Sequence, residues 1–136
     1  HEALLAGLLH AIGSLAGIGY ARDFPDVAQN PVALESSIQA MRSQLSGMIL
    51  STWEMPEELV SAATDAENWY REHNGPADYA DLVIAAQLHE SVGGEIDPAL
   101  VPTYSRLHLS PSEIDLSLEL LHDAHEQVEE TKRMLA

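Results

Sequence analysis

Acidic residues and histidines at helical spacing are the side chains of this sequence that could carry out chemistry. Glu119 and His122 form an E-x-x-H pattern, and Glu126 follows one turn later. Spacings of three and four residues place all three on one side of a helix, as in di-iron carboxylate bundles. Such bundles need a second E-x-x-H copy and two further glutamates, and the sequence has no second copy. A solvated acidic helix face is therefore the simpler interpretation.

Histidines elsewhere in the chain offer other candidate sites. His10 lies in an apolar segment near the start, and His89 is followed directly by Glu90. His89 could share a cleft with His10 if their helices pack together. Because buried polar groups usually find a hydrogen-bond partner inside the protein, a histidine in an apolar segment is more often structural than a ligand. We treat both as candidates for contact with a ligand or partner, and we expect His73 and His108, at helix ends, to be exposed.

Several kinds of chemistry are excluded by what the sequence lacks. It has no cysteine, which rules out disulfides, thiolate metal sites and cysteine nucleophiles. The glycines of the segment 13–19 do not follow a predicted strand, so they are not a dinucleotide-binding fingerprint. No serine lies in the G-x-S-x-G pattern of a nucleophile elbow. The lack of cysteine fits a cytoplasmic protein, which we expect here.

The net charge of the chain limits the kinds of molecule that it can bind. The 136 residues include 22 acidic and 6 basic side chains, a formal net charge of -16. A surface this acidic repels the phosphates of nucleic acids and of anionic membranes. We therefore expect no nucleic acid and no membrane, but a protein partner with basic or apolar patches. Trp53, just before Pro56, either covers the core with its ring or docks onto such a partner.

The first part of the chain is apolar enough to raise the question of a signal peptide. It lacks a basic leading region, and Glu2 and His10 interrupt it. No uninterrupted apolar run reaches the roughly 18 residues expected of a membrane span. We therefore interpret the segment as a core helix. Because His1 stands where a natural chain would have Met, we expect a chain without its natural N-terminus.

Helical periodicity recurs along most of the sequence and predicts an all-α fold. The pattern predicts one bundle-like domain of about six helices, which spans the whole of residues 1–136. The predicted helices cover residues 2–20, 32–53, 57–72, 77–92, 98–107 and 110–133, with a loop over 23–31. Gly13 and Gly17 predict a break or close helix packing inside the first of them.

The predicted helix over residues 32–53 has the clearest apolar stripe. We expect the stripe to lie on the core and Arg42 and Ser46 to lie on the opposite face. The stripe consists of Leu34, Ile38, Met41, Leu45 and Met48 and continues to Thr52.

Four segments, in order, resemble the HDOD domain, a relative of HD-type phosphohydrolases found in bacterial signalling proteins. Residues 6–13 read A-G-L-L-H-A-I-G, close to the family's A-G-L-L-H-D-I-G. Residues 47–56 end a long helix in the manner of L-L-x-x-W-x-L-P, and residues 59–63 follow that proline. Residues 82–86 are similar to the family's I-V-x-L-A helix. The resemblance implies an HD-domain-like fold, and it implies that this chain is the later part of the full domain.

The same resemblance identifies the positions at which an HD phosphohydrolase holds its metals. A methyl group cannot bind a metal, so the Ala11 position is lost, and of the set only His10 keeps a family ligand unless Glu67 substitutes. The positions correspond here to His10, Ala11, Ser43, Ala66, Glu67 and Gln87. We therefore expect no catalytic residue, no metal and no cofactor.

These features together predict a non-catalytic regulatory domain that acts through contacts with another protein or a neighbouring signalling domain. In the family, such neighbours are often receiver or cyclic-di-GMP-related domains. Two alternatives stay open. The chain could be a metal-dependent phosphohydrolase with further ligands before His1, or a small-ligand sensor that uses a cleft lined by His10, Ser43 and Gln87. If helices are missing at the start, the exposed core face should pair with something, such as a second copy of the chain.

Overall fold

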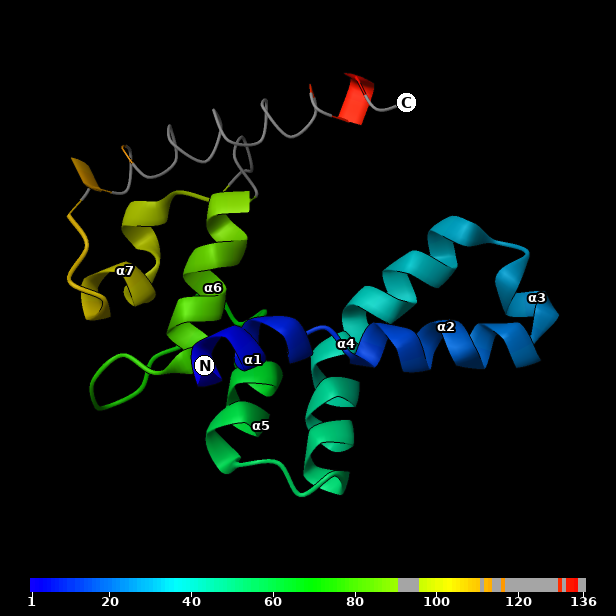
Figure 1. The fold of residues 1–136 in the computed structure, drawn as a ribbon. Helices are drawn as coiled ribbons and strands as arrows, with labels where there is room; N and C mark the ends of the chain where they lie inside the picture. The colour runs from blue at the N-terminus through cyan, green and yellow to red at the C-terminus, as the bar shows by residue number, and fades with distance from the viewer. Residues whose placement is uncertain (91–95, 111, 114–115, 117–129, 131, 135–136) are drawn as a thin grey trace.

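The computed structural model describes residues 1–90, 96–110, 112–113, 116, 130 and 132–134 (Figure 1). Every regular element in these ranges is a helix, which confirms the predicted all-α fold. In chain order the elements are α1 (Glu2–Leu9), α2 (Gly13–Asp23), α3 (Pro25–Ala28), α4 (Pro31–Thr52), α5 (Glu57–Asp65), α6 (Tyr79–Glu90), the 3-10 helix η1 (Pro98–Leu100) and α7 (Pro102–Arg106). Most of the helix predicted over residues 110–133 lies outside the described residues.

The single helix expected over residues 2–20 is two helices, α1 and α2, joined by a turn at residues 10–12. Gly13 opens α2, and its N–H donates a hydrogen bond to Ser46 Oγ of α4 at 2.9 Å. A Cβ atom at Gly13 would lie 2.7 Å from the Ser46 backbone nitrogen and 2.8 Å from Leu45 Cβ. The missing side chain therefore lets α2 lie directly against α4, which is the close packing that the glycine predicted.

The start of α4 is set by its capping residues. Asn30 Oδ1 accepts a hydrogen bond from the Ala33 N–H at 3.1 Å, and Pro31 stands in the first turn, where its missing N–H costs nothing. The loop predicted over residues 23–31 also contains the four-residue helix α3, which begins at Pro25 for the same reason.

The side of α4 that is buried differs from the prediction. Ser46 is completely buried, whereas Met41 and Met48 of the apolar stripe are 50% and 66% exposed. The reason is that α4 lies between two helices: α2 approaches it at Ser46, and α5 approaches it at Gly47, where a Cβ would overlap with Thr64 Oγ1. Only small residues fit between backbones this close, so Met41 and Met48 are left facing outward, whereas Leu34, Ile38 and Leu45 of the stripe are half-buried.

Helix α5 ends at Asp65, earlier than the predicted end at residue 72. The chain then turns, with the Asn68 N–H donating to the Asp65 carbonyl at 2.9 Å and the Arg71 N–H donating to the Asn68 carbonyl at 3.0 Å. The Asp65 carboxylate also pairs with the Arg71 guanidinium at 3.2 Å. The turn therefore directs Arg71 back toward the body of the domain, which a continuous helix could not do.

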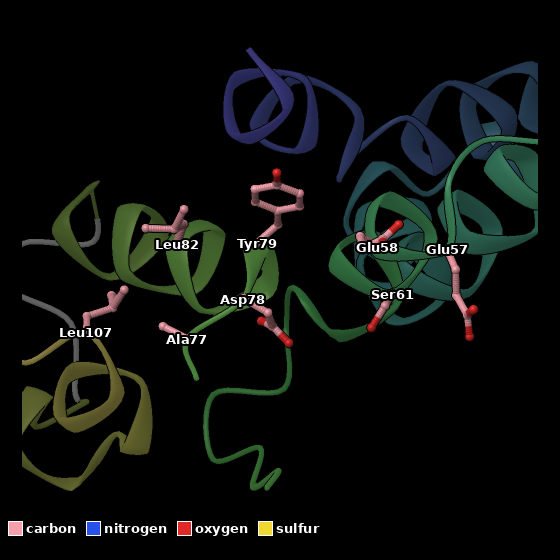
Figure 2. Close-up of a pocket in the computed structure, with 8 residues that line it drawn as sticks. All are labelled: Glu57, Glu58, Ser61, Ala77, Asp78, Tyr79, Leu82 and Leu107. Atoms are coloured by element: carbon pink, nitrogen blue, oxygen red, sulfur yellow. The ribbon is translucent and has the colours of Figure 1, made fainter. Parts of the chain in front are cut away.

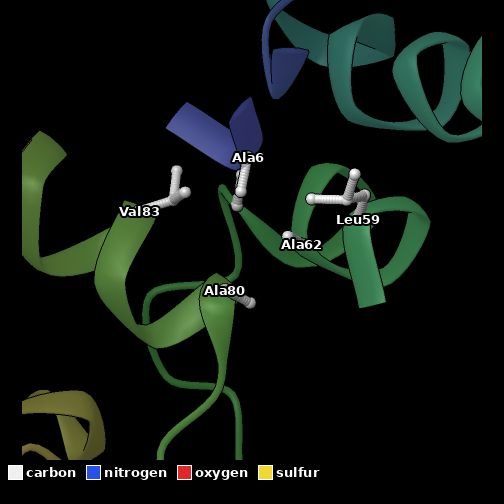
Figure 3. Packing of buried hydrophobic residues seen from close by; sticks show 6 residues of the cluster. Ala6, Leu59, Ala62, Ala80 and Val83 are labelled. Atoms are coloured by element: carbon white, nitrogen blue, oxygen red, sulfur yellow. The ribbon is translucent and has the colours of Figure 1, made fainter. Parts of the chain in front are cut away.

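Two clusters of buried apolar side chains form the core. The first joins α1, α5 and α6 through Ala6, Leu59, Ala62, Ala66, Ala80 and Val83 (Figure 3). The second joins α6 to α7 through Ile84, Ala85, Leu88, Val101 and Tyr104. Helix α6 contributes to both and is the central helix. Among the residues described, neither cluster includes a side chain of α2, α3 or α4, and much of this region extends to one side of the body (Figure 1).

The segment Glu2–Asp23 has the length and apolar composition of a membrane-spanning helix, with 11% of its most apolar window buried. The sequence reading did not expect this. Core helices of soluble proteins and signal sequences pass the same test, so the composition is weak support for a membrane span. In this fold a turn at residues 10–12 divides the segment, and Gly13 is buried against α4.

A Gly13→Ala substitution is expected to lower the free energy of unfolding by about 1–3 kcal/mol, because the added methyl group meets the α4 backbone, which cannot yield easily. Gly19→Ala in the same helix is the matched control. A Cβ there meets nothing within 4 Å, so we expect a gain of up to about 1 kcal/mol from helix propensity. Urea unfolding followed by circular dichroism measures both, and equal effects would contradict the close contact between α2 and α4.

Candidate functional site

The positions predicted to correspond to the HD metal ligands lie just after α1 and α5 and within α4 and α6. His10 follows α1, and its Nδ1 lies 2.6 Å from the Gly7 carbonyl oxygen, a hydrogen bond within its own turn. Ala11, beside it, offers no ligand atom. Ser43 lies on α4, and its buried Oγ has no hydrogen-bond partner among the residues described. At this end of the site, His10 therefore supplies the only side chain of the kind that the family uses as a ligand.

Glu67 is the only carboxylate among these positions, and Arg42 of α4 pairs with it. Both the Nε and the Nη2 of Arg42 contact Glu67 Oε1, which joins α4 to the segment that follows α5. The two side chains are 26% and 25% exposed, so solvent screens the pair only in part. The negative charge that a metal would need is therefore already balanced by a guanidinium.

Gln87 and Ala66 form a second contact in the same region. Gln87 Nε2 of α6 donates to the Ala66 carbonyl oxygen at 2.9 Å, and Ala66 is buried just after α5. The structure thus brings three of the HD positions together at the junction of α5 and α6, where they make contacts within the protein. The alternative of a small-ligand cleft gains no support: grooves of about 740, 450 and 330 Å³ in the described part of the chain are lined by other residues.

A cluster of charged side chains that the sequence reading missed lies at the other end of α6. Asp78 and Asp81 cap the helix reciprocally: the Asp81 N–H donates to Asp78 Oδ1, and the Asp78 N–H donates to Asp81 Oδ2, each at 3.1 Å. This is the arrangement of a capping box, with aspartate in both positions. The D-x-x-D spacing just before an apolar helix, after Asn74-Gly75-Pro76, is the signal that could have revealed it.

Asp81 has no exposed surface, and side-chain donors from α7 and from the residues before α6 surround its carboxylate. Arg106 at the end of α7 donates from Nη2 at 2.6 Å and from Nε at 3.0 Å. Thr103 Oγ1 donates at 2.9 Å, and His73 Nε2 lies 3.0 Å from the other carboxylate oxygen. His73 is therefore half-buried against Asp81, where we had expected an exposed side chain; His108 is exposed as predicted.

Arg71 completes this cluster. Its guanidinium donates two hydrogen bonds to Asp78, at 2.7 and 3.0 Å, and its carbonyl oxygen accepts from Arg106 Nη2 at 3.1 Å. Burial by itself raises the pKa of the Asp81 carboxyl, but the hydrogen bonds from Arg106, His73 and Thr103 outweigh it and hold that pKa well below its usual range. Burial also raises the pKa of Asp78, but the Arg71 hydrogen bond, the Asp81 N–H and the charge of Arg71 together outweigh it and lower that pKa.

The geometry of this cluster raises the question of a metal site. One ligand atom each from His73, Asp78 and Asp81 lies within 4.8 Å of the others. Two guanidiniums already neutralise the two carboxylates, however, and their charges oppose the entry of a further cation. The arrangement is that of a structural ion-pair cluster, which joins α6, α7 and the residues before α6.

The remaining candidates lie on different elements. His89 is buried in α6, with Nδ1 2.6 Å from the Ala85 carbonyl oxygen and 3.3 Å from the Tyr104 hydroxyl of α7. Trp53 is 57% exposed and lines the apolar groove of about 450 Å³ between α2 and α4. The E-x-x-H pattern of Glu119 and His122 lies outside the described residues.

The described part of the chain is all-helical and keeps the H-x-I-G turn and the W-x-M-P helix end on which the resemblance rests. The model of the HDOD domain family matches residues 1–69, half of the chain, and confirms the resemblance. The chain belongs to the HDOD family and is a signalling-associated domain. No curated protein and no solved structure gave a significant match to the chain.

Arg106→Ala is expected to lower the free energy of unfolding by about 3 kcal/mol, because it leaves the buried Asp81 carboxylate without its principal counter-charge. Arg22→Ala is the matched control. Arg22 is 83% exposed and, among the residues that the structure describes, pairs with its neighbour Asp23 alone, so we expect a change within about 0.5 kcal/mol. Chemical denaturation at neutral pH compares the two variants, and a small effect at Arg106 would show that the cluster adds little to stability.

Acid should destabilise the native protein partly through Asp81. Because its pKa is lower in the folded than in the unfolded state, the stabilisation is complete above the unfolded pKa of about 4 and is lost as the pH falls toward the folded value. Unfolding free energies measured between pH 7 and pH 3 should fall less steeply for Asp81→Asn than for the wild type. Parallel pH dependences would show that other carboxyls cause the acid sensitivity.

Proposed function

We propose that this domain is a non-catalytic regulatory module of a cytoplasmic bacterial signalling protein, which works by binding another protein or a neighbouring domain. The observation that carries the proposal is that HD ligand positions are used for contacts within the protein. Glu67 is paired with Arg42, and Gln87 donates to the Ala66 carbonyl. These contacts join α4, α5 and α6 and leave little with which to hold a metal.

The proposal is also supported by comparing the ligands that an HD phosphohydrolase needs with the residues that this chain has at those positions. Their metals polarise a phosphoryl oxygen and generate hydroxide at neutral pH, which requires several nitrogen and oxygen ligands around one site. Here Ala11 and Ala66 present methyl groups, and His10 has no carboxylate next to it. A metal bound through Glu67 would have to displace the Arg42 guanidinium first.

Exposed apolar side chains support the binding part of the proposal. Leu15, Ile18, Met48 and Trp53 on α2 and at the α4 end are all more than half exposed. An apolar groove of about 450 Å³ lies between these helices. Contiguous apolar surface on a soluble domain commonly marks a contact with another protein.

Elemental analysis of protein purified without chelator tests the non-catalytic reading. We expect no stoichiometric transition metal, and no hydrolysis of bis(p-nitrophenyl) phosphate when Mn²⁺ or Fe²⁺ is added, because the ligand set is incomplete. Glu67→Gln is the matched variant: a metal held at the HD positions would be lost from it, whereas metal adsorbed elsewhere would stay. Stoichiometric metal that depends on Glu67, together with hydrolysis, would overturn the proposal.

A further inference from the structure

A groove of about 740 Å³ lies where α5, the start of α6 and the end of α7 meet. Figure 2 shows Glu57 and Glu58 of α5 on one side of this groove and Leu82 and Leu107 on the other. Asp78 and Tyr79 lie between the two sides (Figure 2). The groove therefore has an acidic wall and an apolar wall that face each other.

The charges of the acidic wall are not balanced within the described part of the chain. Glu57 and Glu58 are both exposed, and no cation of the described residues forms an ion pair with either. Asp78 is different, because Arg71 already pairs with its carboxylate. The unbalanced negative charge of the groove therefore comes from the first turn of α5.

Tyr79, which lines the groove, also contacts an acidic group of α1. The Tyr79 hydroxyl donates to Glu2 Oε2 of α1 at 2.5 Å. That hydrogen bond, followed by desolvation and then by the charges of Glu2 and Glu58, raises the pKa of the Tyr79 phenol. On the apolar wall, Leu82 is 41% exposed, although it belongs to the central helix of the core.

We propose that this groove binds a basic amphipathic segment of a protein partner. Lysine or arginine side chains would face Glu57 and Glu58, and apolar side chains would cover Leu82 and Leu107. Opposite charge on one wall and apolar surface on the other are what such a segment presents on its two faces. This inference rests on the proposed binding function and specifies the class of its partner.

The test uses the full chain and a designed helical peptide of roughly 18 residues, about five turns, with leucine on one face and lysine on the other. A scrambled peptide has the same composition but no apolar face. Fluorescence anisotropy at physiological salt should show that the chain binds the amphipathic peptide more tightly than the scrambled one. Glu57→Gln with Glu58→Gln should weaken that binding about five- to tenfold, and Leu82→Gln should weaken it to a similar extent.

Matched controls separate the groove from the general acidity of the chain. Glu35→Gln with Glu72→Gln removes the same charge from exposed positions outside the groove, and Leu100→Gln changes a leucine that is 66% exposed elsewhere. We expect both to leave affinity nearly unchanged. Circular dichroism verifies that α5 survives the loss of its first-turn acids, which also favour the helix dipole.

Equal weakening by the groove and control variants, or equal affinity for the two peptides, would overturn the inference. Either result would assign the binding to non-specific attraction. The non-catalytic proposal would stand in that case, because metal content and hydrolysis test it separately.

Discussion

The buried Asp81 carboxylate is the constraint on which the arrangement of the second half of the domain depends. A charge with no exposed surface must be surrounded by donors, and its donors come from residues far apart in the sequence. His73 lies before α6, and Thr103 and Arg106 belong to α7. Each of these segments is therefore positioned relative to α6 by the need to satisfy one side chain.

The other sites follow from the position of α6. Its first turn supplies Asp78 and Tyr79 to the acidic groove, and its later turns bring Gln87 to the Ala66 carbonyl and His89 to Tyr104. Gln87, the HD position on α6, and the groove residues Tyr79 and Leu82 thus lie at different points along one helix. This separation explains how the domain can use HD positions for internal contacts and still keep an exposed surface for a partner.

Local signals in the sequence predicted much of the fold. Pro31 and the stop before Pro56 define α4, and Gly13 predicted the close packing of α2. The sequence also allowed Ala11 to be set against the aspartate of the family motif, because the residues around His10 align without gaps. The sequence could not reveal which residues replace them. Arg42 looked like a solvent-facing residue, and Asp81 finds Arg106 across 25 residues of chain. Pairings of this kind depend on how helices pack, which periodicity does not specify.

The placement of the core clusters also bears on how the domain unfolds locally. Within the described part of the chain, α2, α3 and α4 add no side chain to either cluster, and small residues make the contact of α4 with α2. Hydrogen exchange and proteolysis divide proteins into cooperative units according to such differences in buried contacts. The placement of the two clusters therefore predicts that the hairpin of α2 and α4 opens more readily than the body around α6. A partner that docks on the hairpin would therefore order the part of the domain that opens most readily.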